Sequence, residues 1–113
     1  MKKNVQSNLL RAPELPQATY DPSTDQYDLD VALLNSDIEI LATYGNESTN
    51  DQVTMFVGEP ITREIATPPS TVFRYARNEF PDGVYRVYYM VTEAVGNTAK
   101  SEAVKLKISN AKG

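Results

Sequence analysis

Hydrophobic and polar residues alternate with a period of two along most of this chain. Apolar side chains occupy every second position from Ile38 to Tyr44, and Val53, Met55 and Val57 repeat the pattern between Asn50 and Gly58. Such alternation predicts β-strands with one face on a core and the other toward solvent, whereas an amphipathic helix would repeat every 3.6 residues. No segment shows a convincing helical period, so we expect an all-β protein.

Turn-forming sequences divide the chain into short extended segments. The segments GNESTND, ATPPS and EAVGN are rich in residues that favour turns, and ITREI lies between them as a short strand with its charges outward. Further alternation predicts strands at Tyr27–Leu33, Thr71–Ala76 and Val104–Ile108. Seven to eight short strands with turns between them predict an immunoglobulin-like antiparallel β-sandwich.

The segment FPDGVYRVYYMVT combines a turn with a strand that is unusually rich in tyrosine. Gly83 is expected to supply the positive φ angle of a tight turn after Asp82. In immunoglobulin-like sandwiches a tyrosine near the start of strand F bonds to upstream backbone through its hydroxyl, and Tyr85 stands at the corresponding place. The pleat then points one set of side chains toward the core: Tyr85, Val87, Tyr89 and Val91. We therefore assign Gly83 and Tyr85 structural roles.

Length and composition favour one compact domain without enzymatic chemistry. The chain has 113 residues, no Cys and no His, which removes disulfides, thiolate metal sites and the commonest general base. We divide it into a flexible N-terminal tail (1–11), the sandwich domain (12–109) and a C-terminal tail (110–113). The basic start MKKNVQSNLLRAP lacks the continuous apolar stretch of an export signal, and no later run is long enough to span a bilayer. We expect no membrane insertion.

Charge is distributed unevenly along the chain, whose formal net charge is -4. The segment Ala12–Thr62 contains ten acidic residues and neither Lys nor Arg. Its most clustered acids, Asp21, Asp25, Asp28 and Asp30, are ligands of the kind that calcium prefers, but they lack the spacing of an EF-hand. Solvated strand faces and loops are the favoured interpretation, so no cofactor is expected, with calcium as the alternative. The acidic balance also argues against a nucleic-acid partner.

Several motifs resemble the bacterial Ig-like domains that are repeated in tandem along large surface and adhesion proteins. The run Asp82-Gly83-x-Tyr85-x-Val87-x-Tyr89-x-Val91, followed by Gly96-Asn97 and Ser101, is similar to their closing hairpin. Asn50–Gly58 is similar to a Gly-Asp-x-Val-x-Leu-Tyr-Trp-x-Gly segment of such repeats, and Ala12-Pro13-x-Leu15 resembles their opening strand. The chain departs from the pattern at Asn50, where the repeats have Gly, and at Val57, where they have Trp. The resemblance implies a non-catalytic module of a bacterial surface protein.

The second face of the tyrosine-rich strand is a candidate binding surface. Arg86, Tyr88 and Met90 point away from the core, and strands C, F and G lie side by side in immunoglobulin-like sandwiches. That order predicts an outward patch, rimmed by basic residues, formed by Phe56, Arg86, Tyr88, Met90, Lys105 and Lys107. Exposed aromatic surface with a basic rim suits contact with a partner, whereas the alternative is an aromatic pair that only stabilises the sheet.

Three functions from different classes remain open. The first is a structural or adhesive spacer that contacts neighbouring Ig-like modules or itself. The second is a recognition module that binds carbohydrate, peptide or another copy through the outward patch. The third is a small hydrolase with two acidic residues, which has the least support because acids are common on any surface. We expect an extracellular or cell-surface location for an excised module, and a cytoplasmic one for a chain that is native as given.

Overall fold

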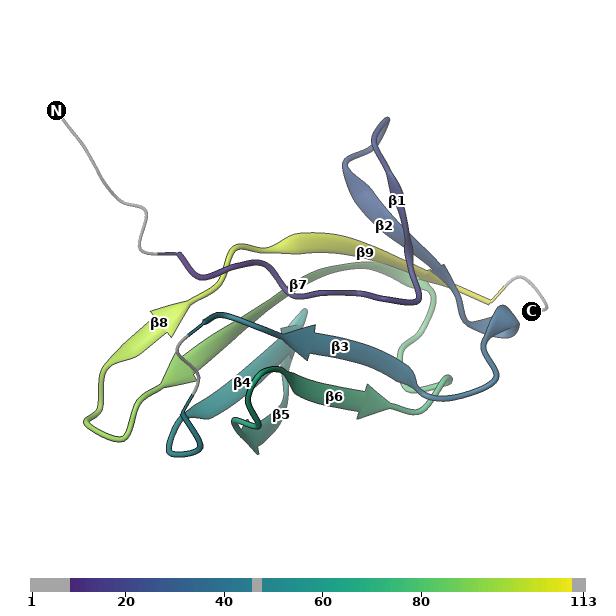
Figure 1. Cartoon of the computed structure of the whole chain (residues 1–113). Helices are drawn as coiled ribbons and strands as arrows, with labels where there is room; N and C mark the ends of the chain where they lie inside the picture. Colours follow the sequence, from purple (N-terminus) through teal and green to yellow (C-terminus); the bar gives the residue numbers. More distant parts are fainter. Residues whose placement is uncertain (1–8, 46–47, 111–113) are drawn as a thin grey trace, which may run out of the picture.

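Two β-sheets pack against each other in the computed structural model, which describes residues 9–45 and 48–110 and, of residues 60–63, only the backbone (Figure 1). The strands are β1 (Thr19–Asp21), β2 (Gln26–Asp30), β3 (Ile38–Ala42), β4 (Gln52–Val57), β5 (Glu59–Ile65), β6 (Thr71–Tyr75), β7 (Gly83–Thr92), β8 (Thr98–Lys100) and β9 (Val104–Ser109). The larger sheet has the order β1-β2-β9-β7-β4-β5, with β8 also paired to β7, and the smaller sheet pairs β3 with β6. The predicted all-β sandwich is confirmed.

The details of strand number and direction differ from the prediction. Nine strands occur in the described part of the chain, whereas seven to eight were predicted. The three-residue strands β1 and β8 were not among the predicted strands. The predicted opening strand at Ala12–Leu15 is reduced to an isolated bridge between Glu14 and Leu41. One pair, β2 with β9, runs parallel, while the other strand pairs are antiparallel.

The core lies between the sheets, where the alternating apolar residues meet. In β3 every second side chain is buried, and in β4 the same holds for Val53, Met55 and Val57. Val87 and Tyr89 of β7 are fully buried and Val91 nearly so, while Tyr85 packs against the core from its edge. Burial of apolar area is the main force that holds the two sheets together. The predicted inward faces of these strands are confirmed.

The predicted strand Tyr27–Leu33 ends early. After Asp30 the chain enters a 3-10 turn, Val31–Leu33, in which Val31 is buried but Leu33 is 78% exposed. The Asp30 carboxylate accepts a hydrogen bond from the Ala32 backbone N–H at 3.0 Å, the arrangement that favours a helical turn over a continued strand. The alternating pattern predicted that Leu33 faces the core, and this prediction was wrong.

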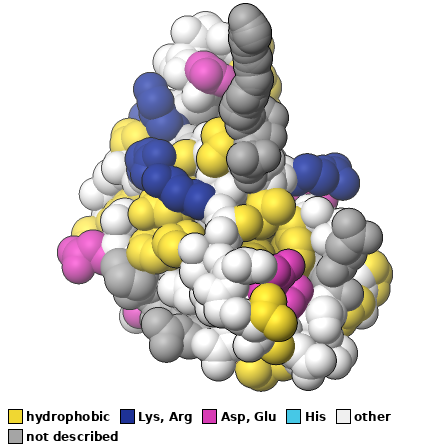
Figure 2. Space-filling view, turned by 90° about the vertical axis from the view of Figure 1, so that its left-hand side faces the viewer, with side chains coloured by type: hydrophobic (Ala, Val, Ile, Leu, Met, Phe, Trp, Pro, Cys, Tyr) yellow, Lys and Arg dark blue, Asp and Glu magenta, His cyan; other side chains and the backbone are white. Residues whose placement is uncertain are grey.

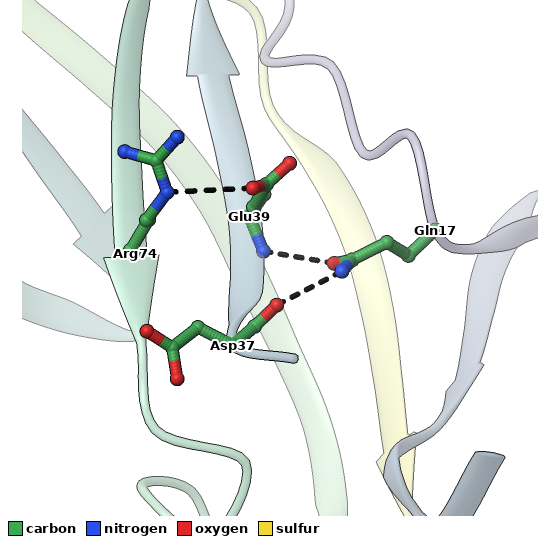
Figure 3. A network of polar contacts seen from close by, with 4 residues as sticks. All are labelled: Gln17, Asp37, Glu39 and Arg74. Carbon is green, nitrogen blue, oxygen red and sulfur yellow. Dashed lines mark hydrogen bonds and ion pairs between the residues drawn. The ribbon is translucent and has the colours of Figure 1, made fainter. Parts of the chain in front are cut away.

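The segment that contains Glu14 and Gln17 covers the edge of β3 that β6 leaves open. Glu14 and Leu41 exchange two backbone hydrogen bonds of 2.9 and 3.0 Å. Farther along, the side-chain amide of Gln17 accepts from the Glu39 N–H at 2.8 Å and donates to the Asp37 carbonyl at 2.9 Å, so it takes the place of a strand residue (Figure 3). An edge satisfied in this way is less able to pair with another chain.

The tyrosine corner expected at Tyr85 is present. Its hydroxyl donates to the carbonyl oxygen of Pro81, four residues upstream. Gly83, however, is the first residue of β7 and is not among the described glycines with positive φ, which are Gly45, Gly58 and Gly96. The expectation of a positive φ at Gly83 was wrong, because the chain is already extended there. A Cβ at Gly83 would lie 3.7 Å from the Tyr85 ring, an ordinary contact.

Within the described residues, no helix has the length and apolar character needed to span a membrane.

Candidate binding face

The larger sheet brings together the six residues of the predicted outward patch. β7 lies between β4 and β9, as expected for strands C, F and G. Cross-strand register pairs Phe56 with Tyr88 and Arg86 with Lys105. Met90 lies two residues beyond Tyr88 on the same face, and Lys107 is the partner of Val84 at the other end. These outward side chains are called the outward face below.

The aromatic centre of the outward face is a stacked pair. The rings of Phe56 and Tyr88 are nearly parallel, with centroids 4.5 Å apart and an interplanar angle of 3°. Both side chains are half-buried, so the pair contributes to the sheet as the alternative interpretation anticipated. Stabilisation of the sheet and contact with a partner are compatible, because both residues remain partly exposed.

Two cations contact the same tyrosine ring. The guanidinium carbon of Arg86 lies 4.6 Å from the Tyr88 ring centroid, and the ammonium of Lys100 lies 5.1 Å from it. Cation–π contacts of this kind hold long side chains in place. Lys100 was missed by the sequence reasoning, because it belongs to the short strand β8, which pairs it with Met90. Lys100 could have been identified only if Thr98–Lys100 had been predicted as a strand separate from β9.

The cations of the outward face form no ion pair with a described carboxylate, although Asp28 is the cross-strand neighbour of Lys107. Arg86 and Lys105 are direct cross-strand neighbours, and both side chains are exposed. In the described part of the chain, the ion pair is between Arg74 and Glu39 on the smaller sheet, at 3.4 Å. It does not involve a cation of the outward face. Seen from the side of β8, Figure 2 shows Lys and Arg side chains gathered beside hydrophobic ones. The outward face is therefore a positive area on an acidic protein.

A groove of about 620 Å³ continues the outward face toward the hairpin of β1 and β2. Its lining consists of Tyr20, Asp25, Tyr27, Val84, Arg86, Ala103, Val104 and Lys105. The hairpin, which projects from the body of the sandwich in Figure 1, supplies the first three of these residues. Tyr20 is 47% exposed, and its ring centroid lies 5.1 Å from that of Tyr27. The sequence reasoning did not identify this wall, because β1 was not predicted.

The clustered acids of the hairpin make separate local contacts. Asp21 accepts from the Ser23 backbone N–H at 2.9 Å and from the Ser23 hydroxyl at 2.7 Å, and these hydrogen bonds lower the pKa of the Asp21 carboxyl. Asp25, at φ 54°, accepts from the Tyr20 hydroxyl at 2.7 Å, which raises the pKa of Tyr20. Asp28 accepts from the Gln26 side-chain amide at 3.2 Å. Each of these carboxylates thus makes at least one contact within the hairpin.

No group of three or more His, Cys, Asp or Glu side chains able to hold a metal ion occurs among residues 9–45 and 48–110. The four hairpin acids of the calcium alternative are among those described residues.

Comparison with protein-family models and with curated proteins returned no match for this chain.

Proposed function

We propose that this chain is a non-catalytic Ig-like module that acts as a spacer or interaction domain of a bacterial surface protein. The observation that carries the proposal is the path of the chain through the sandwich. Leu10 pairs with Ser101, just before β9, while β9 itself runs on to Ser109. The two positions are eight residues apart in the sequence, and the last six residues form β9, so they lie at most roughly 26 Å apart. A chain that enters at one end and leaves at the other suits modules joined end to end.

The motifs that resemble tandem Ig-like repeats support the same proposal. The tyrosine corner at Tyr85 and the neighbouring strands β4, β7 and β9 agree with that architecture. Covered sheet edges suit a module that must stay separate from its neighbours, and Gln17 provides such a cover on β3.

Small-angle X-ray scattering of two full chains joined head to tail tests the spacer role. We expect the longest dimension of the pair to approach twice that of one chain. The same two chains joined by a long Gly/Ser linker provide the control for an unrestrained arrangement. A pair no longer than a single chain, with the copies folded against each other, would contradict the spacer role.

The cellular context needs a separate test, an immunoblot of fractionated source cells. A very large band in the surface fraction supports a repeat of an adhesin. An intracellular band near the mass of the 113-residue chain contradicts the surface location and leaves a free-standing protein.

A second candidate function is recognition through the outward face. The observation that favours it is the facing pair Arg86 and Lys105, neither of which forms an ion pair with a described carboxylate. Saturable binding that is lost on substitution of this pair would distinguish a recognition module from a pure spacer.

A further inference from the structure

The pairing of Arg86 with Lys105 is unfavourable for the isolated fold. Like charges directly opposite each other on neighbouring strands destabilise a sheet, whereas opposite charges would stabilise it. The chain contains 15 Asp and Glu residues, yet none of the described ones forms an ion pair with either cation. The Tyr88 ring, 4.6 Å from the Arg86 guanidinium carbon, also limits how far that cation can swing away. An anionic ligand between the two cations would convert this repulsion into attraction.

The groove beside the pair has the size and lining of a small-molecule site. Its volume of about 620 Å³ lies within the usual range for ligand pockets, and Arg86 and Lys105 belong to its wall. The hairpin residues Tyr20 and Tyr27 also line the groove, and their rings provide apolar surface with polar edges. Asp25 adds a carboxylate whose Oδ1 accepts from Tyr20, and a carboxylate accepts further hydrogen bonds.

We infer that this groove binds an acidic oligosaccharide, with a sugar carboxylate between Arg86 and Lys105 and the sugar rings against Tyr20 and Tyr27. The planar guanidinium of Arg86 matches a carboxylate in a bidentate fashion, and Lys105 adds a second positive charge. Sugar hydroxyls supply donors for Asp25, whereas the acidic side chains of a peptide supply only acceptors. The tyrosines bury the apolar face of a sugar ring. This inference deepens the recognition function and does not depend on the spacer role.

Titration calorimetry of the full chain with trigalacturonate, at low salt, is the direct test. The matched probe is the methyl ester of the same trisaccharide, which keeps the sugar rings and loses the charges. We expect saturable binding of the acid, at least about tenfold weaker binding of the ester, and an affinity that falls as salt is added. Equal binding of acid and ester, or no binding of either, would overturn the inference.

Substitutions in the groove give a readout that a purely structural role would not produce. Lys105→Glu places an acid opposite Arg86, so we expect the melting temperature to rise by a few degrees while affinity for trigalacturonate drops at least about tenfold. Arg86→Gln should weaken binding to a similar extent. The matched control Arg74→Gln, on the smaller sheet, should leave binding unchanged. Unchanged affinity in Lys105→Glu and Arg86→Gln would contradict the site.

The tyrosine wall has its own pair of variants. Tyr20→Phe keeps the ring and Tyr20→Ser removes it, so only the serine variant should weaken binding of the trisaccharide. Equal binding by both would show that the hairpin is not part of the site, and would overturn the inference.

An acidic peptide tests the saccharide ligand separately from recognition through the outward face. If a short poly-glutamate peptide binds more tightly than trigalacturonate, and Arg86→Gln abolishes that binding, the saccharide is overturned while recognition through the outward face stands. Head-to-tail scattering reports on the spacer role separately, so failure of one proposal is visible without the other.

Discussion

The rings of Phe56 and Tyr88 stack across β4 and β7 at 4.5 Å, with planes inclined by only 3°. Such a pair contributes about 0.5–1.5 kcal/mol beyond the area it buries. We expect a double-mutant cycle of Phe56→Leu, Tyr88→Leu and the double variant to show a coupling of that size in the free energy of unfolding, measured in denaturant. If the double variant lost as much free energy of unfolding as the two single variants together, the two rings would be independent.

The hydroxyl of Tyr85 ties the start of β7 to the loop before it. Tyr85→Phe removes the hydrogen bond to the Pro81 carbonyl and should lower the free energy of unfolding by about 0.5–1.5 kcal/mol. Tyr20→Phe is the matched control, since it removes a tyrosine hydroxyl bonded to Asp25 in an exposed hairpin, and it should cost less. Equilibrium denaturation with an unchanged m-value measures both. A Tyr85→Phe variant as stable as the parent would leave the corner without a stabilising role.

Ser101 lies between β8 and β9 and forms a hydrogen bond with the backbone of β7. Its side chain is buried; the hydroxyl oxygen accepts from the Tyr89 N–H, and the hydroxyl O–H donates to the Glu102 carbonyl, both at 2.9 Å. Ser101→Ala leaves the buried Tyr89 N–H without this acceptor, so we expect a loss of about 1–3 kcal/mol in the free energy of unfolding.

Hydrogen exchange checks the cause of that loss. The Tyr89 amide should exchange faster in Ser101→Ala, whereas Ser36→Ala, at an exposed position, should change neither stability nor this amide. Unchanged protection of the Tyr89 amide would argue that another group replaces the serine oxygen.

The turn between β1 and β2 should respond to acid through Asp21. Its pKa is lowered chiefly by the side-chain hydrogen bond from Ser23, so the stabilising contact is complete above the ordinary carboxyl value of 3.8 and is lost as pH falls through the lower folded-state pKa. Ser23→Ala should raise the pKa of Asp21 toward 3.8, as measured by carbon NMR of the carboxyl group. A pKa that does not move would assign the shift to the backbone contacts instead.

Inward and outward positions were readable from the sequence where a strand is long and regular. Ile38, Ile40 and Val53 are buried as predicted, because apolar alternation reflects the pleat itself. The prediction failed at Leu33, because a single capping carboxylate at Asp30 ended the strand one turn earlier. Short-range capping competes with the periodic pattern and is not visible in it.

The candidate site was only partly predictable for a related reason. Phe56, Tyr88, Arg86 and Lys105 could be grouped once the order of strands C, F and G was assumed, and the structure places them together. Lys100 and Tyr20 could not, since they lie on three-residue strands with too few residues to show a period.

The sequence by itself determined which side chains of each long strand face the core and which face outward, because the pleat alternates with every residue wherever the strand lies. Only the tertiary structure decided which outward side chains meet. Backbone pairing between distant segments sets Arg86 opposite Lys105, brings Lys100 over the Tyr88 ring, and lets the Gln17 amide close the edge of β3. These contacts depend on register between strands, and register is a property of two segments that neither segment carries alone.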